Sequence, residues 1–224
     1  MLFRSDCLVP RDWAQRLVAY LGRSGVDAIG GSIDIADPEN LSGAATYFLE
    51  FLHHFPRLGR CSERHTFLLG CNLGVRRRVM DCVPFPDRTL AEDVLFSDHL
   101  RRLGFGVLYD PMITVQHFNR LGWGECWAYA HKMGRAAADY HSERQRPWMR
   151  PVLSWPVLAT PLALLVTPLI AVRLLRSRSA HWGLFVRVIP ACVLGNLLWA
   201  RGFQERMVER KHRAPAGDAQ GYER

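Results

Sequence analysis

The sequence predicts an α/β domain followed by helical membrane segments. Over residues 1–118, short apolar patterns typical of strands alternate with amphipathic patterns typical of helices, and this alternation is characteristic of α/β proteins. Beyond residue 150 the chain carries two long apolar runs. The formal net charge is +8, and the basic excess lies in the C-terminal half, interleaved with those runs. We therefore expect a membrane surface as the basic partner, or a solvated basic face, and no nucleic acid.

The first elements alternate between strand and helix. Residues 1–3 form an apolar stub typical of a strand, and apolar side chains at helical spacing predict a helix over residues 10–21. Residues 26–29 alternate as a strand does and end in a glycine pair. Residues 32–40 are rich in turn formers, and residues 41–55 predict a second helix that a proline closes.

The second part of the α/β domain repeats this alternation. Residues 66–69 predict a buried strand, and residues 90–103 predict a helix whose first turn contains two adjacent carboxylates. Residues 105–109 and 113–117 predict two further short strands, the second of which ends in a histidine. The pattern up to residue 118 is therefore that of one domain built from several α/β units.

The C-terminal half is predicted to be helical and membrane-bound. Residues 119–150 predict an amphipathic interfacial helix. Its helical pattern runs from residue 123 to about residue 144, where apolar side chains oppose basic ones. Residues 151–201 predict a membrane hairpin. Its first span rests on residues 152–172, a run of 21 residues without a charge, long enough to cross a hydrocarbon core of about 30 Å. Three prolines in this run also permit a re-entrant helix, and Arg187 makes the second span less apolar.

The charges beside the hairpin predict its orientation. Eight cations flank the two spans, namely Arg144, Arg146, Arg150, Arg201, Arg206, Arg210, Lys211 and Arg213, and three lie between them, namely Arg173, Arg176 and Arg178. By the positive-inside rule, both flanks and the α/β domain face the cytoplasm at the inner membrane. Residues 202–224 form a basic, partly disordered tail. The six cysteines show no paired spacing, and we expect reduced thiols.

Three groups of polar residues stand at positions where chemistry is expected. Asp6 directly follows the strand-like stub, where a carboxylate can offer oxygen to a divalent metal. Glu92 and Asp93 are adjacent in a helix, so their side chains point about 100° apart and one can face inward as a general base. Arg76 and Arg77 could meet phosphate oxygens. The simpler alternatives are an ordinary acidic helix start and a solvated basic helix face.

Taken together and in this order, the motifs resemble those of family 2 glycosyltransferases with the GT-A fold, over roughly residues 1–135. The segments that carry the resemblance are LFRSDC at residues 2–7, VDAIGG at residues 26–31, GCNLGVRR at residues 70–77 and LAEDVLF at residues 90–96. They are similar, respectively, to the family's strand with its metal motif, the strand and glycine pair, the G-x-N-x-x-x-R-R segment and the Glu-Asp helix. Several motifs in the right order are more specific than any one of them.

The resemblance implies an inverting hexosyltransferase of the cell envelope, which moves a sugar from a nucleotide-sugar donor to a lipid-linked or glycan acceptor at the membrane. It implies Asp93 as the catalytic base and Glu92 as its structural or acceptor-binding neighbour. It implies that Asp6 and His117 hold a divalent metal, Mg or Mn, although a strand-end histidine can also be purely structural. The implied donor-binding and acceptor-binding residues are Gly31, Asn72, Arg76 and Arg77.

The sequence also departs from the family pattern. Arg4 stands where the metal motif has its first aspartate, and the chain carries no nucleotide-binding unit before that motif. We therefore expect a partial GT-A domain that lacks its N-terminal half, through a late start codon, a degenerate gene or a split enzyme with a partner chain. The Q-x-x-R-W signature of processive synthases is absent, which favours addition of one or a few sugars. The alternative function is a non-catalytic membrane-bound binding protein or complex subunit derived from such a transferase.

Overall fold

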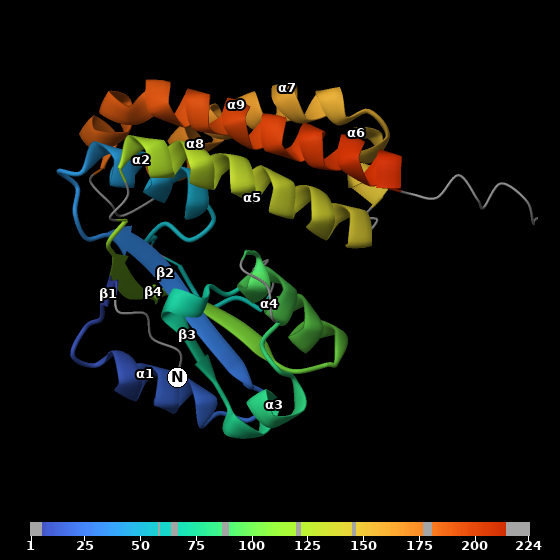
Figure 1. Cartoon of the computed structure of the whole chain (residues 1–224). Coiled ribbons are helices and arrows are strands. Elements are labelled where there is room, and N and C mark those ends of the chain that lie inside the picture. The colour runs from blue at the N-terminus through green and yellow to red at the C-terminus, as the bar shows by residue number, and fades with distance from the viewer. Residues whose placement is uncertain are drawn as a thin grey trace, which may run out of the picture.

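The computed structural model describes residues 6–57, 59–63, 67–86, 90–119, 122–144, 147–176 and 181–213. Within these residues the chain forms a mixed four-stranded sheet with its own helices, and a layer of helices that lies across one end of the sheet (Figure 1). This architecture confirms the predicted α/β class. The stub at residues 1–3, Arg4, and the tail beyond residue 213 lie outside the described residues.

The sheet has the strand order β1-β4-β2-β3. The long central strands β2 (Ala28–Ile35) and β4 (Val107–His117) are parallel, while β1 (Cys7–Leu8) pairs antiparallel with β4 and β3 (Leu73–Val75) pairs antiparallel with β2. Seven of the eight residues of β2 are buried, because both faces of this strand are covered. Strands β2 and β4 therefore form the framework that positions the residues of the site.

The two strands predicted over residues 105–109 and 113–117 are one continuous strand, β4. The pairing with β2 runs to Gly31 opposite Asp110 and resumes at Ser32 opposite Thr114, so three residues of β4 bulge out between these two pairs. Pro111 lies in this bulge and has no N–H to donate to the ladder. This interruption makes the single strand β4 look like two strands in the sequence. Strand β2 also differs from the prediction, because it continues to Ile35 through residues predicted to form a turn.

The strand predicted over residues 66–69 is wrong for the part that the structure describes, residues 67–69. Their extended backbone pairs with a helix side chain and not with a strand, because the hydroxyl of Ser97 accepts a hydrogen bond from the N–H of Leu68 at 2.9 Å. A 3₁₀ turn at Gly70–Asn72 follows, and the strand that joins the sheet is β3.

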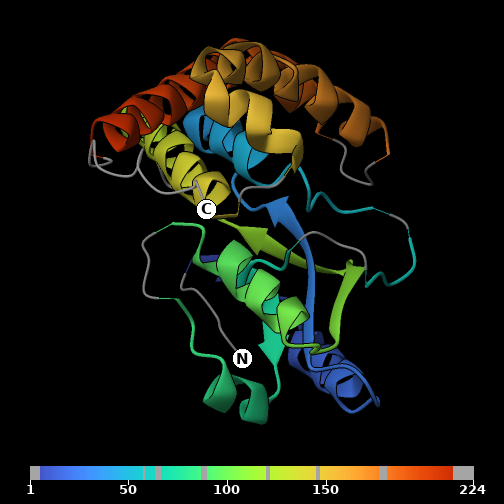
Figure 2. The same ribbon diagram turned by 90° about the vertical axis from the view of Figure 1, so that its right-hand side faces the viewer.

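Helices cover both faces of the sheet. The neighbouring residues Ala28 and Ile29 point to opposite faces, as strand neighbours do, and each belongs to a different apolar cluster. Helix α1 (Trp13–Leu21) covers the face of Ile29, and helices α3 (Arg77–Cys82) and α4 (Glu92–Arg102) cover the face of Ala28 (Figure 2). The predicted helices over residues 10–21 and 90–103 are confirmed in type, with slightly later starts.

Three mutually packed helices form the main part of the helical layer. Helix α2 (Leu41–Glu50) and helix α5 (Trp123–Arg144) both pack against α9 (Trp182–Arg213), which is the longest helix of the described chain. Helices α5 and α9 approach closely at Gly134 and Gly202, where an added Cβ would lie 1.9 and 2.1 Å from a backbone oxygen of the facing helix. The predicted helix over residues 123–144 is confirmed, and the helix predicted over residues 41–55 ends at Glu50.

The first apolar run is not one straight helix. Its elements are α6 (Arg150–Ser154), a 3₁₀ turn (Pro156–Leu158), α7 (Ala159–Leu164) and α8 (Val166–Leu175), after a further 3₁₀ turn (Pro147–Met149). Pro161 and Pro168 are each the third residue of their helix, where the backbone N–H has no partner within the helix in any case. The prolines therefore set where each short helix begins.

Two segments of the described chain, Pro156–Leu175 and Trp182–His212, are long and apolar enough to cross a membrane by length and composition. Each segment is only partly covered, since 22% of the most apolar stretch of the first and 39% of that of the second is buried. Exposed large side chains include Trp155, Leu165, Leu175 and Val186. Exposed apolar surface of this extent favours membrane association.

Candidate active site

Two adjacent carboxylates begin α4, as the sequence predicts. The preceding residue, Ala91, has a left-handed φ of 62°, which costs an alanine roughly 1–2 kcal/mol. This turn holds Asp93 against the backbone of Gly70, whose N–H donates to one carboxylate oxygen at 3.4 Å, while the N–H of Val94 donates to the other at 2.8 Å. The turn and these two bonds fix the direction of the Asp93 side chain.

The surroundings of Asp93 make it a stronger base than an ordinary aspartate. Burial, and then the negative charge of Glu92, raise the pKa of Asp93 to about 6, although the backbone bonds from Val94 and Gly70 act in the opposite direction. A carboxylate with this pKa is mostly ionised at neutral pH and still accepts a proton readily. These properties are those of a general base.

Further titratable groups lie around Asp93 that the sequence analysis missed. A hydrogen bond with Cys7, burial, and the charges of Glu50 and Asp93 raise the pKa of Cys71 well above its usual value. Glu50 accepts a hydrogen bond from the hydroxyl of Tyr129 at 2.9 Å. Helices α2 and α5 of the helical layer therefore bring Glu50 and Tyr129 to the site. The one sequence signal for Glu50 is a single carboxylate in an otherwise apolar helix pattern.

The predicted metal residues Asp6 and His117 lie together at the β1 edge of the sheet. The carboxylate of Asp6 and Nε2 of His117 are 3.5 Å apart, and Cys7 is the pairing partner of His117. Asp6, Cys7 and His117 offer an oxygen, a sulfur and a nitrogen atom that all lie within 4.8 Å of one another. A sulfur and a nitrogen donor beside a single oxygen suit zinc better than magnesium or manganese, both of which prefer oxygen ligands, so the donor set does not itself favour the expected Mg or Mn. The contact between Cys7 and Cys71 joins this group to the surroundings of Asp93.

The predicted binding residues Gly31 and Asn72 meet at the bulge between β2 and β4. The amide nitrogen of Asn72 donates to the backbone oxygens of Ser32 and Ile113, both at 2.9 Å, and its oxygen accepts from the indole of Trp13 at 2.9 Å. A Cβ at Gly31 would lie 1.9 Å from the backbone oxygen of Ile113. Both residues thus stabilise the irregular pairing, and their contact with a ligand stays a prediction.

The predicted binding residues Arg76 and Arg77 lie at the other end of β3 from Asn72, and the structure does not bring them to Asp93. The guanidinium of Arg76 donates to the backbone oxygens of Val26 and Arg23 at 2.8 and 3.0 Å. Arg77 is exposed and pairs with Asp81, four residues later in α3, at 3.1 Å. Arg77 therefore lies on a solvated helix face, as the simpler alternative predicts.

The fold and the site define an α/β protein with a carboxylate pair at a helix start, a neighbouring Asp-Cys-His group and an apolar helical layer. No protein-family model matches the sequence, and no curated protein matches it.

Proposed function

We propose that the chain is an inverting glycosyltransferase of the family 2 type, with a partial GT-A fold, that transfers a sugar from a nucleotide-sugar donor to a lipid-linked or glycan acceptor. The observation that carries the proposal is Asp93, a carboxylate with a pKa of about 6 at a strained helix start beside Glu92. The ordered motifs of the sequence supply the reaction class.

Asp93 would take the proton of an acceptor hydroxyl as that oxygen attacks the anomeric carbon of the donor sugar. The new C–O bond forms as the bond to the nucleoside diphosphate breaks, so the configuration at this carbon inverts. Glu92 supports the step by keeping the pKa of Asp93 high. Asp6 and His117 would hold a divalent ion, which when bound supplies positive charge that stabilises the departing diphosphate.

The helical layer would hold this site at the membrane. The apolar segments Pro156–Leu175 and Trp182–His212 expose much of their surface, and Trp155 and Trp182 are partly or largely exposed near their ends, as aromatic side chains are at membrane interfaces. With more cations on the flanks than between the spans, the α/β part would face the cytoplasm at the inner membrane. An acceptor anchored in lipid would then reach the site from the helical layer.

One observation favours the alternative, a non-catalytic membrane-bound binding protein or complex subunit. The polar groups of Asn72 and Arg76, both predicted to bind ligand, already make hydrogen bonds within the fold. A chain that had lost transfer could keep such bonds, because they stabilise the sheet and not a ligand.

Product analysis distinguishes the two. Membranes from cells that express the gene are incubated with a panel of UDP-, GDP- and dTDP-sugars and Mn²⁺, and nucleoside diphosphate release is measured against membranes without the gene. We expect release above background and a product whose anomeric configuration, determined by NMR, is inverted. Retention of configuration would contradict the proposed mechanism, and no release with any donor would favour the alternative.

A further inference from the structure

A mostly apolar cavity of about 490 Å³ lies between the helical layer and the start of α4. This volume is within the range of roughly 300–1,000 Å³ typical of small-molecule sites. Its walls come from α2, α5, α7, α8 and α9, and small residues of three of these helices leave the space, among them Ala137, Ala163 and Gly195. Ala91 and Val94, on either side of the carboxylate pair, close the end nearest Asp93.

The cavity offers few charges to a ligand. Glu50, at its border, is hydrogen-bonded by Tyr129. Burial, and then the charge of Arg173, lower the pKa of the lining residue His53 to about 4, so His53 is neutral at pH 7. The remaining wall is mainly hydrocarbon and aromatic, including Trp199. Such a space fits a hydrocarbon chain.

A second hollow, of about 830 Å³, adjoins the apolar cavity, and it is polar. The two share Ala91, Tyr129, Ala136 and Tyr140 as lining residues, so they meet beside the carboxylate pair. Four cations and two carboxylates line the polar hollow: Lys132, Arg135, Arg206, Arg210, Asp139 and Glu143. The net charge of its lining is therefore positive.

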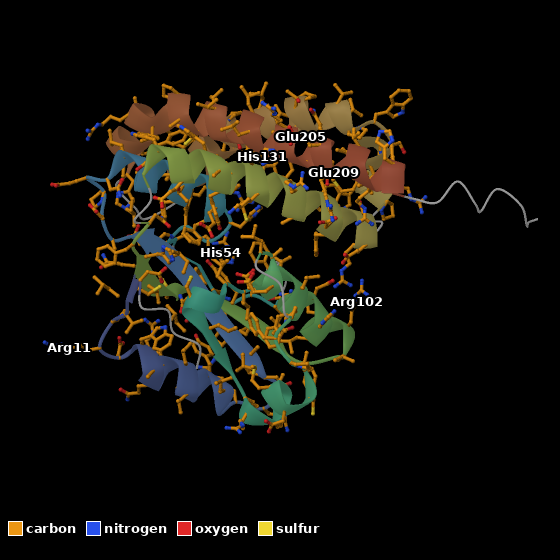
Figure 3. The ribbon with its side chains drawn as sticks, viewed as in Figure 1. Arg11, His54, Arg102, His131, Glu205 and Glu209 are labelled. Atoms are coloured by element: carbon orange, nitrogen blue, oxygen red, sulfur yellow. The ribbon has the colours of Figure 1, made fainter. Side chains whose placement is uncertain are left out.

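The pairing of these charges shows which cation is available. Asp139 accepts hydrogen bonds from Arg206 and Arg210 at 2.9 Å, and Arg135 binds both oxygens of Glu209 at 2.8 Å. His131 and Glu205 make a further bond of 2.8 Å, and together these pairs tie α5 to α9 (Figure 3). Lys132 is exposed and makes no ion pair among the described residues. Its ammonium group can therefore meet a ligand anion without breaking a bond of the fold.

We propose that the two hollows together bind one lipid with a phosphate-containing head, the hydrocarbon chain in the apolar cavity and the phosphate beside Lys132. This deepens the proposed function and rests on it for the role of the lipid, which is that of the acceptor. Ala91, which lines both hollows, directly precedes Glu92 and Asp93 in the chain, so the proposal expects the head at the start of α4. The exposed apolar faces of α7 and α8 would let the lipid enter from the membrane.

Photolabelling of the full chain in lipid nanodiscs tests this binding without requiring turnover. The probe is dodecyl phosphate with a diazirine near the end of its chain, and adducts are mapped by mass spectrometry. We expect adducts on cavity-lining residues of α2 and α5, such as Leu49 and Met133. Adducts confined to the outer faces of α7, α8 and α9, or equal cavity labelling by the matching dodecanol probe, would overturn the proposal.

Two matched pairs of variants sharpen the result. Ala137→Phe fills the cavity and should reduce cavity labelling about tenfold, whereas Ala19→Phe, on the exposed side of α1, should not. Lys132→Glu should reduce cavity labelling by the dodecyl phosphate probe about tenfold. Lys211→Glu, which changes the charge by the same amount, should leave this labelling unchanged. Equal labelling within either pair would contradict the proposed placement of the chain or of the phosphate.

Further arms identify the source of the phosphate and separate the two proposals. Competition by an isoprenyl phosphate but not by a diacyl phosphatidate identifies a single-chain carrier, and the reverse identifies a glycerophospholipid. Displacement by inorganic phosphate alone at equal concentration would overturn the lipid assignment. If Asp93→Asn is labelled like the wild type but no donor is turned over by either, the lipid site stands and the transferase proposal fails. If sugar transfer occurs without cavity labelling, the transferase proposal stands and the lipid site fails.

Discussion

The acid side of the pH profile should report Asp93 directly. Because burial and Glu92 raise the pKa of Asp93 to about 6, the rate of sugar transfer should fall below pH 6, where the base becomes protonated. An ordinary aspartate would keep its charge to about pH 4. Between pH 6 and pH 5 the ionised fraction falls from about one half to about one tenth, so kcat/KM should drop about fivefold over this interval.

Glu92→Gln removes the neighbouring charge and leaves burial unchanged. The pKa of Asp93 should then move downward by roughly one unit, a change of about 1.4 kcal/mol in the cost of ionising it. The assay is kcat/KM from nucleoside diphosphate release between pH 4.5 and 8.5, with the exposed Asp81→Asn as the matched control. A wild-type profile flat down to pH 5, or a Glu92→Gln profile shifted to higher pH, would refute the reasoning.

Three further outcomes follow from the structure. Asp93→Asn should raise the free energy of unfolding at pH 7 by up to about 3 kcal/mol, because it removes the cost of ionising a buried carboxyl. This gain, measured by urea titration, should fade from pH 6 to pH 4, since the folded wild-type carboxyl is protonated there and that cost disappears. Gly134→Ala should lower Tm through a clash with the backbone of α9 that costs about 1–3 kcal/mol, whereas Gly124→Ala, which has open space, should not. His117→Ala should weaken Mn²⁺ binding at least tenfold by electron paramagnetic resonance, and unchanged affinity, or equal loss in His99→Ala, would remove His117 from the metal site.

Local patterns in the sequence were enough to predict several elements. The helix over residues 123–144 and the first turn of α4 with Glu92 and Asp93 stand where the spacing of apolar residues and the acidic pair put them. These features depend on contacts between residues three or four positions apart. The sequence therefore predicted the carboxylate pair, but not what surrounds it.

The errors in the strands have a common physical cause. Residues 67–69 are apolar like a buried strand, yet they pack beside α4, where Ser97 bonds Leu68. Pro111 divides the pattern of β4 although the strand continues beyond its bulge. Short apolar runs show burial, but the partner that buries them is set by distant parts of the chain.

The missed parts of the site depend on contacts between distant residues. Glu50 and Tyr129 are 79 positions apart, and Arg135 and Glu209 are 74 positions apart. No local pattern encodes such a pair, because each member alone looks like an ordinary polar residue on a helix. The apolar cavity is likewise created where five helices pack together beside the start of α4, and only the structure reveals it.

The central claim is that Asp93 is the general base of sugar transfer. The most direct measurement is the single-turnover transfer rate of Asp93→Asn at pH 7.5 relative to the wild type, in the same membranes and with Asp81→Asn as the control. Loss of general-base catalysis should lower this rate by about 10²–10⁴-fold, while Asp81→Asn remains at the wild-type rate. A rate for Asp93→Asn within a few-fold of the wild type would contradict the claim.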